Sequence, residues 1–178
     1  MRLLKTLPNG DFRVTGELLS DAIPQYAILS HTWGDESQEV TFEDIMKVSG
    51  RDKAGYQKIK FCSEQAARDG LQYFWVDTCC IDKSSAAELS ENINSMFQWY
   101  KNAIKCYVFL TDVSMSNNED DTESLLRNSR WFTRSWTLQE LLAPQSIEFF
   151  SREHSRLGDK KLLERQLHQI TGISIYAL

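Results

Sequence analysis

The chain has 178 residues, a net charge of −5 and 42% hydrophobic residues, which is typical of a single folded domain. The negative charge argues against a general nucleic-acid binder, because such proteins normally carry a basic surface. No apolar run approaches the roughly 20 residues that cross a bilayer, and residues 1–10 do not resemble a signal peptide. The four cysteines form no CxxC pair and no disulfide-like spacing, which predicts a reduced, cytoplasmic protein.

The predicted elements alternate between strands and helices along the chain. Short apolar runs predict strands over residues 26–30, 73–77, 106–110 and 146–150. Apolar residues at spacings of three and four predict helices over residues 53–68, from Ser84 or Ser85 to Ile104, over 129–144 and over 160–170. Gly70 is expected to end the first helix, and the acidic residues 114–122 are typical of an exposed loop.

Strands separated by helices indicate an α/β fold, in which a mainly parallel sheet has helices on both faces. Ligands bind such sheets at the carboxyl ends of the strands. Polar residues gather in the sequence at these positions, in SHTWG (residues 30–34), DTCCID (77–82) and Thr111-Asp112. The sequence therefore predicts a site at this edge of the sheet.

The segment 129–144 carries a second candidate feature. Trp136 and Glu140 are one helical turn apart, so in a continuous helix the indole and the carboxylate share a face. A carboxylate beside an aromatic wall suits a cationic or ring-bearing ligand. Arg134, half a turn before Trp136, is expected to serve the core or an interface instead. The competing interpretation is a partly buried tryptophan with a surface or capping glutamate.

Three segments together resemble a known family. YAILSHTWG (residues 26–34), FWVDTCCID (74–82) and RSWTLQELLAP (134–144) are similar, in order and spacing, to the signature blocks of the HET (heterokaryon incompatibility) domain of filamentous fungi. The resemblance extends from residue 1 to about residue 150. It is greatest to HET domains that precede a NACHT ATPase and WD40 repeats in NLR-like proteins.

The resemblance implies one HET domain over residues 1–178, with a signature core over 26–150. Residues 151–178 are expected to form a helical extension, with the C-terminal part of the family missing. No P-loop or WD repeat occurs in the sequence, so the chain is expected to be either a fragment of a longer protein or a stand-alone effector domain.

The family also implies a function. HET domains act in programmed cell death when genetically different hyphae fuse, and they are remotely similar to TIR domains, whose sheet is flavodoxin-like. In enzymatic TIR domains a glutamate in a W-C-x-x-E-L motif cleaves the nicotinamide–ribose bond of NAD. By position, the resemblance assigns this catalytic role to Glu140 and the first-loop serine to Ser30. It further implies NAD as substrate, no permanently bound cofactor, activation by self-association, and NACHT/WD40 or other NLR-type regulatory regions as partners.

Cleavage of this bond passes through an oxocarbenium-like state, which a nearby carboxylate stabilises. The tryptophan rings are expected to stack on rings of the ligand, and Arg134 or His31 to bind a phosphate. Gly34 is expected to let the backbone approach the ligand closely. The residues predicted to contact the ligand around Glu140 are Ser30, His31, Trp33, Gly34, Asp77, Cys80, Asp82 and Trp136.

Other interpretations stay open. In one alternative, the domain is not an enzyme and signals by self-association. In another, Asp77, Asp82 and Glu140 hold a metal and hydrolyse nucleic acid, which the acidic charge disfavours. With three histidines and no clustered ligands, no metal site is predicted. Asp77 and Asp82 equally suit hydrogen bonds to loop backbone, and Cys80 suits a buried packing role.

Overall fold

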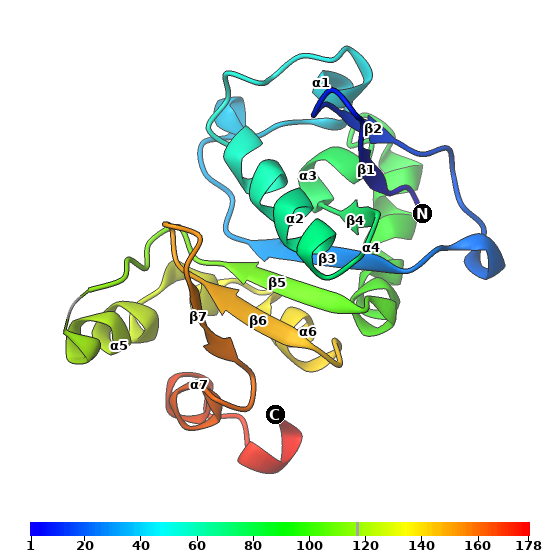
Figure 1. Cartoon of the computed structure of the whole chain (residues 1–178). Coiled ribbons are helices and arrows are strands. Elements are labelled where there is room, and N and C mark those ends of the chain that lie inside the picture. The colour runs from blue at the N-terminus through cyan, green and yellow to red at the C-terminus, as the bar shows by residue number, and fades with distance from the viewer. Residues whose placement is uncertain (117) are drawn as a thin grey trace.

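The computed structural model describes residues 1–116 and 118–178 and places seven strands of these residues in one mixed sheet. The strand order is β2-β1-β4-β3-β5-β6-β7 (Figure 1). The strands are β1 (Leu4–Thr6), β2 (Phe12–Val14), β3 (Tyr26–His31), β4 (Tyr73–Trp75), β5 (Lys105–Phe109), β6 (Ile147–Phe150) and β7 (Arg156–Asp159).

The four inner strands run parallel and the outer strands antiparallel. Counted along the chain, the parallel strands β3, β4, β5 and β6 have the spatial order 2-1-3-4, as in flavodoxin-like sheets. The order reverses between β3 and β5, and ligands of such sheets bind beyond the carboxyl ends of the strands at this point. The predicted α/β fold with a mainly parallel sheet is confirmed.

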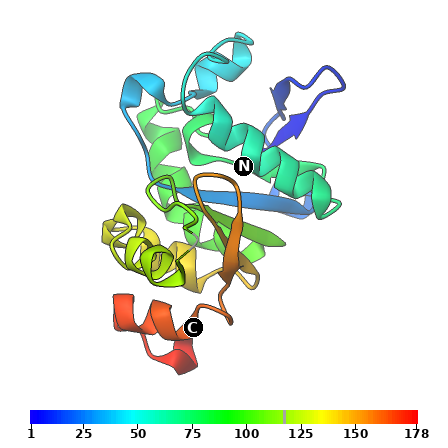
Figure 2. The same ribbon diagram turned by 60° about the vertical axis from the view of Figure 1, so that its left-hand side comes forward.

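Helices cover both faces of the sheet. The α-helices are α1 (Phe42–Met46), α2 (Tyr56–Arg68), α3 (Asp77–Cys80), α4 (Ala86–Asn102), α5 (Glu119–Arg127), α6 (Thr137–Leu142) and α7 (Glu164–Thr171). Within the described residues, four short 3-10 helices lie at Ser20–Ala22, Glu36–Gln38, Arg130–Thr133 and Ile175–Ala177. Helix α2 lies on one face, and α4 and α6 lie on the other (Figures 1 and 2).

Both faces of the central strand are buried, so β3 has no exposed residue. On the α2 side, the ring of Phe61 stacks on Phe109 with centroids 4.7 Å apart. On the α4 side, the hydroxyl of Tyr26 donates to the Trp99 carbonyl at 2.6 Å. β3 and its parallel neighbour β5 are therefore packed against helices on the two faces of the sheet, which gives the residues at the carboxyl end of β3 a rigid base.

The predicted strands and the helices α2 and α4 are present, with boundaries shifted by a few residues. Ser85 caps α4 by accepting from the Glu88 amide, and Gly70 follows α2 with a φ of +75°, as predicted. The exposed loop predicted over residues 114–122 is partly wrong, because α5 begins at Glu119; residue 117 lies outside the described residues. The final helix begins at Glu164, four residues later than predicted.

The continuous helix predicted over residues 129–144 is wrong. A 3-10 helix, capped by Ser129, ends at Thr133, and α6 begins only at Thr137. Arg134 between them is extended, with φ −80° and ψ 145°. Ser129, Thr133 and Ser135 favour caps and turns over helix interiors, which explains the break.

Candidate functional site

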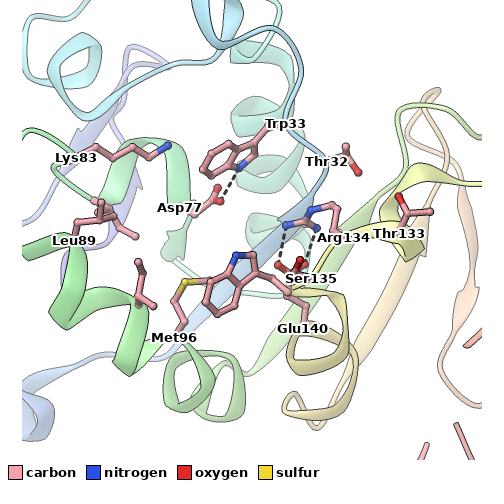
Figure 3. Close-up of a pocket in the computed structure, with 13 residues that line it drawn as sticks. Thr32, Trp33, Asp77, Lys83, Leu89, Met96, Thr133, Arg134, Ser135 and Glu140 are labelled. Atoms are coloured by element: carbon pink, nitrogen blue, oxygen red, sulfur yellow. Dashed lines mark hydrogen bonds and ion pairs between the residues drawn. The ribbon is translucent and has the colours of Figure 1, made fainter. Parts of the chain in front are cut away.

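A pocket of about 460 Å³ opens at the predicted edge of the sheet (Figure 3). Residues from the segments after β3, β4 and β5 meet there, together with one face of α4. Its lining residues are Thr32, Trp33, Asp77, Ile81, Lys83, Leu89, Ile93, Met96, Thr133, Arg134, Ser135, Trp136 and Glu140. The pocket thus combines an apolar wall from α4 with aromatic, cationic and acidic side chains from the strand ends.

Glu140 lies at the base of this pocket with 1% of its surface exposed. The Ser30 hydroxyl donates to its Oε2 at 2.5 Å. The buried indole of Trp131 donates in turn to Ser30 Oγ at 2.7 Å. The interpretation of Glu140 as a surface carboxylate is therefore wrong, since β3, the 3-10 helix and α6 all contribute to holding it.

Arg134 forms a bidentate ion pair with Glu140, with both N···O distances 2.9 Å (Figure 3). Burial lowers the pKa of Arg134, but the charge and hydrogen bonds of Glu140 outweigh this, and the pKa is raised. The expectation that Arg134 serves the core or an interface is wrong. It rested on helical spacing, and the extended backbone at Arg134 lets its guanidinium reach the carboxylate of the next helix.

Asp77 follows β4 and begins α3 at the other side of the pocket. The indole of Trp33 donates to its Oδ2 at 2.7 Å, and the Lys83 ammonium lies 3.8 Å from the centre of a Trp33 ring. Burial, and secondarily the charge of Glu140, raises the pKa of Asp77 to about 6.

His31 is buried on the opposite face of the sheet from Ser30, because successive strand residues point to opposite faces. Its Nδ1 lies 3.9 Å from Asp77 Oδ1, and its Nε2 lies 4.0 Å from Glu39 Oε2. Glu39 is paired with Lys58 and accepts the Gly34 amide at 2.6 Å. Burial, aided by nearby cations, lowers the pKa of His31 well below its usual value.

The predicted site residues thus occupy different places. Glu140, Trp33, Asp77 and Trp136 line the pocket, whereas Ser30 and His31 lie directly behind Glu140 and Asp77. Gly34 contributes its amide to Glu39. The thiol of Cys80 is buried and accepts the Val76 amide at 3.4 Å, and the Asp82 carboxylate accepts the Ser84 amide at 3.0 Å. Neither residue lines the pocket.

The two predicted pocket tryptophans are partly open to solvent. Trp33 is 47% exposed and Trp136 is 42% exposed. Trp131, in contrast, is fully buried and reaches Ser30 from the core. The first two indoles are therefore available to a ligand, and the third is a structural donor.

Sequence reasoning missed three contributors. Glu39 and Lys58 form the buried pair behind His31, and Lys83 lies over Trp33. No motif marks these residues, because they come from a loop, a helix face and a turn that meet only in the fold. The position of Trp131 in the RWFTRSW segment likewise gives no sign that its indole meets Ser30.

Chemically, the pocket presents two carboxylates, two cations and two accessible indoles. Among residues 1–116 and 118–178, no three His, Cys, Asp or Glu side chains gather where they could hold a metal ion. None of the described helices is long and apolar enough to cross a membrane. The donor set suits an organic ligand with rings and anionic groups.

Comparisons with known proteins identify the family. The family model described as heterokaryon incompatibility protein (HET) matches residues 26–123, more than half of the chain. The chain is 54% identical over 182 aligned residues to the vegetative incompatibility protein HET-E-1 of Podospora anserina. That match covers 100% of this chain and 13% of the relative, so the chain spans a small part of that protein. No solved structure matches significantly. The chain belongs to the heterokaryon incompatibility (HET) family.

Proposed function

We propose that the domain cleaves the nicotinamide–ribose bond of NAD, with Glu140 as the catalytic carboxylate, and thereby triggers cell death in vegetative incompatibility. The observation that carries this proposal is the position of Glu140 at the base of a pocket of about 460 Å³, at the carboxyl ends of the parallel strands. The TIR-like position of Glu140 in the WTLQEL segment supports the same assignment.

The environment of Glu140 suits electrostatic stabilisation. A carboxylate offers about four lone-pair sites, and the Ser30 hydroxyl and the two Arg134 donors occupy three of them. One site is left for a ribose hydroxyl or for the developing positive charge on the sugar. A carboxylate held by three donors needs no reorganisation when this charge develops.

The rest of the pocket fits the other parts of NAD. Trp33 and Trp136 expose indole surface on which nicotinamide or adenine can stack. Lys83 carries a positive charge at the pocket mouth beside Trp33, where a pyrophosphate can pair with it. The apolar wall formed by Leu89, Ile93 and Met96 excludes water from one side of the ligand.

The proposal extends to the cellular setting. All four cysteines are free and buried, which is compatible with a reducing cytoplasm. Because the relative is much longer than this chain, regulatory regions of the NACHT/WD40 or another NLR type are proposed to control the domain and to bring copies together.

The test is nicotinamide release by the purified chain, fused to a scaffold that oligomerises on addition of a small molecule. Clustered wild-type protein is expected to convert NAD to nicotinamide, and Glu140→Gln is expected to lose this activity. Glu91→Gln, on the exposed face of α4, is the matched control and is expected to stay active. Circular dichroism verifies that each variant is folded. Intact NAD with the clustered wild type would overturn the proposal.

A second candidate is a non-enzymatic module that signals by self-association. Large apolar side chains are exposed on the two helices beside the pocket, and this observation favours an interface: Ile93, Phe97, Leu138 and Leu142. Cell killing that survives Glu140→Gln but is lost in Phe97→Ser would support this candidate over catalysis.

A further inference from the structure

Three buried polar atoms lie in a row from behind β3 to the pocket, and none has a hydrogen-bond partner among the described residues. They are Glu39 Oε2, His31 Nε2 and Asp77 Oδ1. The row is continuous, because His31 lies 4.0 Å from Glu39 through Nε2 and 3.9 Å from Asp77 through Nδ1. Buried polar groups are nearly always satisfied, so three neighbouring exceptions point to a role other than stability.

The two ends of the row differ. At the inner end, Glu39 is fixed by Lys58 and by the Gly34 amide. At the outer end, Asp77 lines the pocket and its side chain is 14% exposed (Figure 3). Trp33 donates to Oδ2 of Asp77, whereas Oδ1 is buried and lies toward His31. A proton that enters the row from the pocket therefore meets Asp77 first.

Burial, aided by neighbouring cations, keeps the imidazole of His31 neutral. Burial and the positive charges of Lys58, Arg134 and Lys83 lower its pKa. A neutral imidazole has one N–H and one acceptor nitrogen. We assign the N–H to Nε2, on the side of the fixed Glu39 carboxylate 4.0 Å away, which leaves the Nδ1 lone pair facing Asp77 Oδ1. A proton on Asp77 would supply the missing donor between these two acceptors, and a hydrogen bond would form once the two atoms, 3.9 Å apart, move into hydrogen-bond distance.

We propose that Asp77 is a second catalytic carboxylate of the pocket, the proton acceptor for the water that attacks NAD, with His31 and Glu39 as positioning residues behind it. This inference rests on the proposed NAD cleavage. The water oxygen bonds to ribose C1′ and its proton passes to Asp77. The bond from C1′ to the nicotinamide nitrogen breaks, and its electron pair neutralises the ring nitrogen. Asp77 then shares the proton with Nδ1 of His31 until solvent removes it.

The geometry assigns different tasks to the two carboxylates. Glu140 is held by three donors and serves as a fixed charge. No group of the described residues donates to Oδ1 of Asp77, which faces Nδ1 of His31, the nitrogen assigned as acceptor, so Asp77 is set to gain a proton. The raised pKa of Asp77, about 6, lies near the operating pH of a cytoplasmic enzyme, as a general base requires.

The test compares two nucleophiles. Water releases a proton when it attacks C1′, whereas a pyridine base that replaces nicotinamide releases none. We therefore expect Asp77→Asn to lower hydrolysis by about 10²–10⁴-fold while base exchange is largely retained. The asparagine still accepts from Trp33. Glu140→Gln is expected to lower both reactions, and Asp52→Asn, at an exposed position, neither. Equal losses of hydrolysis and exchange in Asp77→Asn, or no loss, would overturn the inference.

A titration tests the positioning residues without any turnover. In the unliganded wild type, the carboxyl carbon of Asp77 followed by NMR is expected to titrate near pH 6. His31→Gln removes the Nδ1 acceptor and is expected to shift this titration to lower pH. The proposed coupling of Asp77, His31 and Glu39 would be refuted if Asp77 titrates near its ordinary pKa, or if His31→Gln leaves its pKa unchanged. A wild type that shows this coupling but leaves NAD intact refutes the proposed NAD cleavage and retains the row as a proton site for another substrate.

Discussion

The two carboxylates of the pocket lie in opposite kinds of surroundings. Glu140 has three donors, from Ser30 and Arg134, and a buried indole behind them. Asp77 has one donor, from Trp33, and faces a neutral imidazole across 3.9 Å. The number of hydrogen bonds that the protein supplies to each carboxylate therefore separates their roles. Three donors hold Glu140 as a fixed negative charge, whereas a single donor leaves Asp77 able to accept a proton.

The largest expected loss of stability comes from a substitution of Glu140, the carboxylate with three donors. Glu140→Gln leaves the guanidinium of Arg134, whose side chain is 20% exposed, without a counter-charge. Loss of one partner from a buried pair is expected to lower the free energy of unfolding by about 3 kcal/mol. Urea denaturation at pH 7 measures this. A change below about 0.5 kcal/mol, equal to that of Glu91→Gln, would contradict the account.

The position of Glu39, behind His31 and Asp77, can be disturbed without substituting any of these three residues. A Cβ at Gly55 would lie 2.8 Å from both the Gln38 carbonyl and Glu39 Oε2. Gly55→Ala is therefore expected to displace Glu39 and to lower the free energy of unfolding by about 2 kcal/mol. Thermal denaturation is the measurement, with Gly16→Ala as control, because a Cβ at Gly16 meets nothing within 4 Å. Equal stability of the two variants would show that Glu39 is not fixed as described.

Asp77→Asn is expected to raise the free energy of unfolding, and to do so only at pH values where Asp77 is ionised in the wild type. Folding raises the pKa of Asp77 from an ordinary value of about 3.9 to about 6. A raised folded pKa favours the native state below pH 4, and this contribution is lost as the pH rises through 6. The variant lacks this loss, so at pH 8 it is expected to be more stable than the wild type by about 3 kcal/mol, at about 1.4 kcal/mol for each pH unit between the two pKa values.

Denaturation curves from pH 4 to pH 8 check this prediction. The stability difference between Asp77→Asn and the wild type is expected to grow between pH 4 and pH 6 and then to stay constant. A difference that does not depend on pH would mean that Asp77 has an ordinary pKa and no special place in the pocket.

Trp33→Phe is expected to have the smallest effect. The substitution removes the donor to Asp77 Oδ2, whose hydrogen bond lowers the pKa of Asp77. The pKa of Asp77 should therefore rise further, with a loss of about 1 kcal/mol of stability where Asp77 is ionised. NMR titration of the Asp77 carboxyl carbon measures the shift, and a lower value would contradict the assigned donor.

The sequence was sufficient to predict the parallel strands of the sheet but not the short strands at its edges. Strands such as YAILS and CYVFL are continuous apolar runs, as expected for strands buried on both faces. β1 and β2 have three residues each, LKT and FRV, which are too short to show a period. They form only because β1 pairs with β4 and β2 with β1.

The candidate site was only partly predictable for a similar reason. Glu140, Trp33, Asp77 and Trp136 follow from the polar blocks and the resemblance, and they line one pocket. The expected strand stopped at Ser30, so His31 was placed in the turn beside it. The strand in fact includes His31, and strand alternation sends the two side chains to opposite faces. The Arg134–Glu140 pair was missed because the expected helix is broken between them.

The most direct measurement is a crystal structure with an NAD analogue in which a carbon atom replaces the ring oxygen of the nicotinamide riboside, so that it resists cleavage. The account predicts the nicotinamide riboside in the pocket beside Trp33 and Trp136. It places a ribose hydroxyl on Glu140, and Asp77 toward the side of C1′ that water attacks. An analogue bound elsewhere, or in the pocket without contact to Glu140, would contradict it.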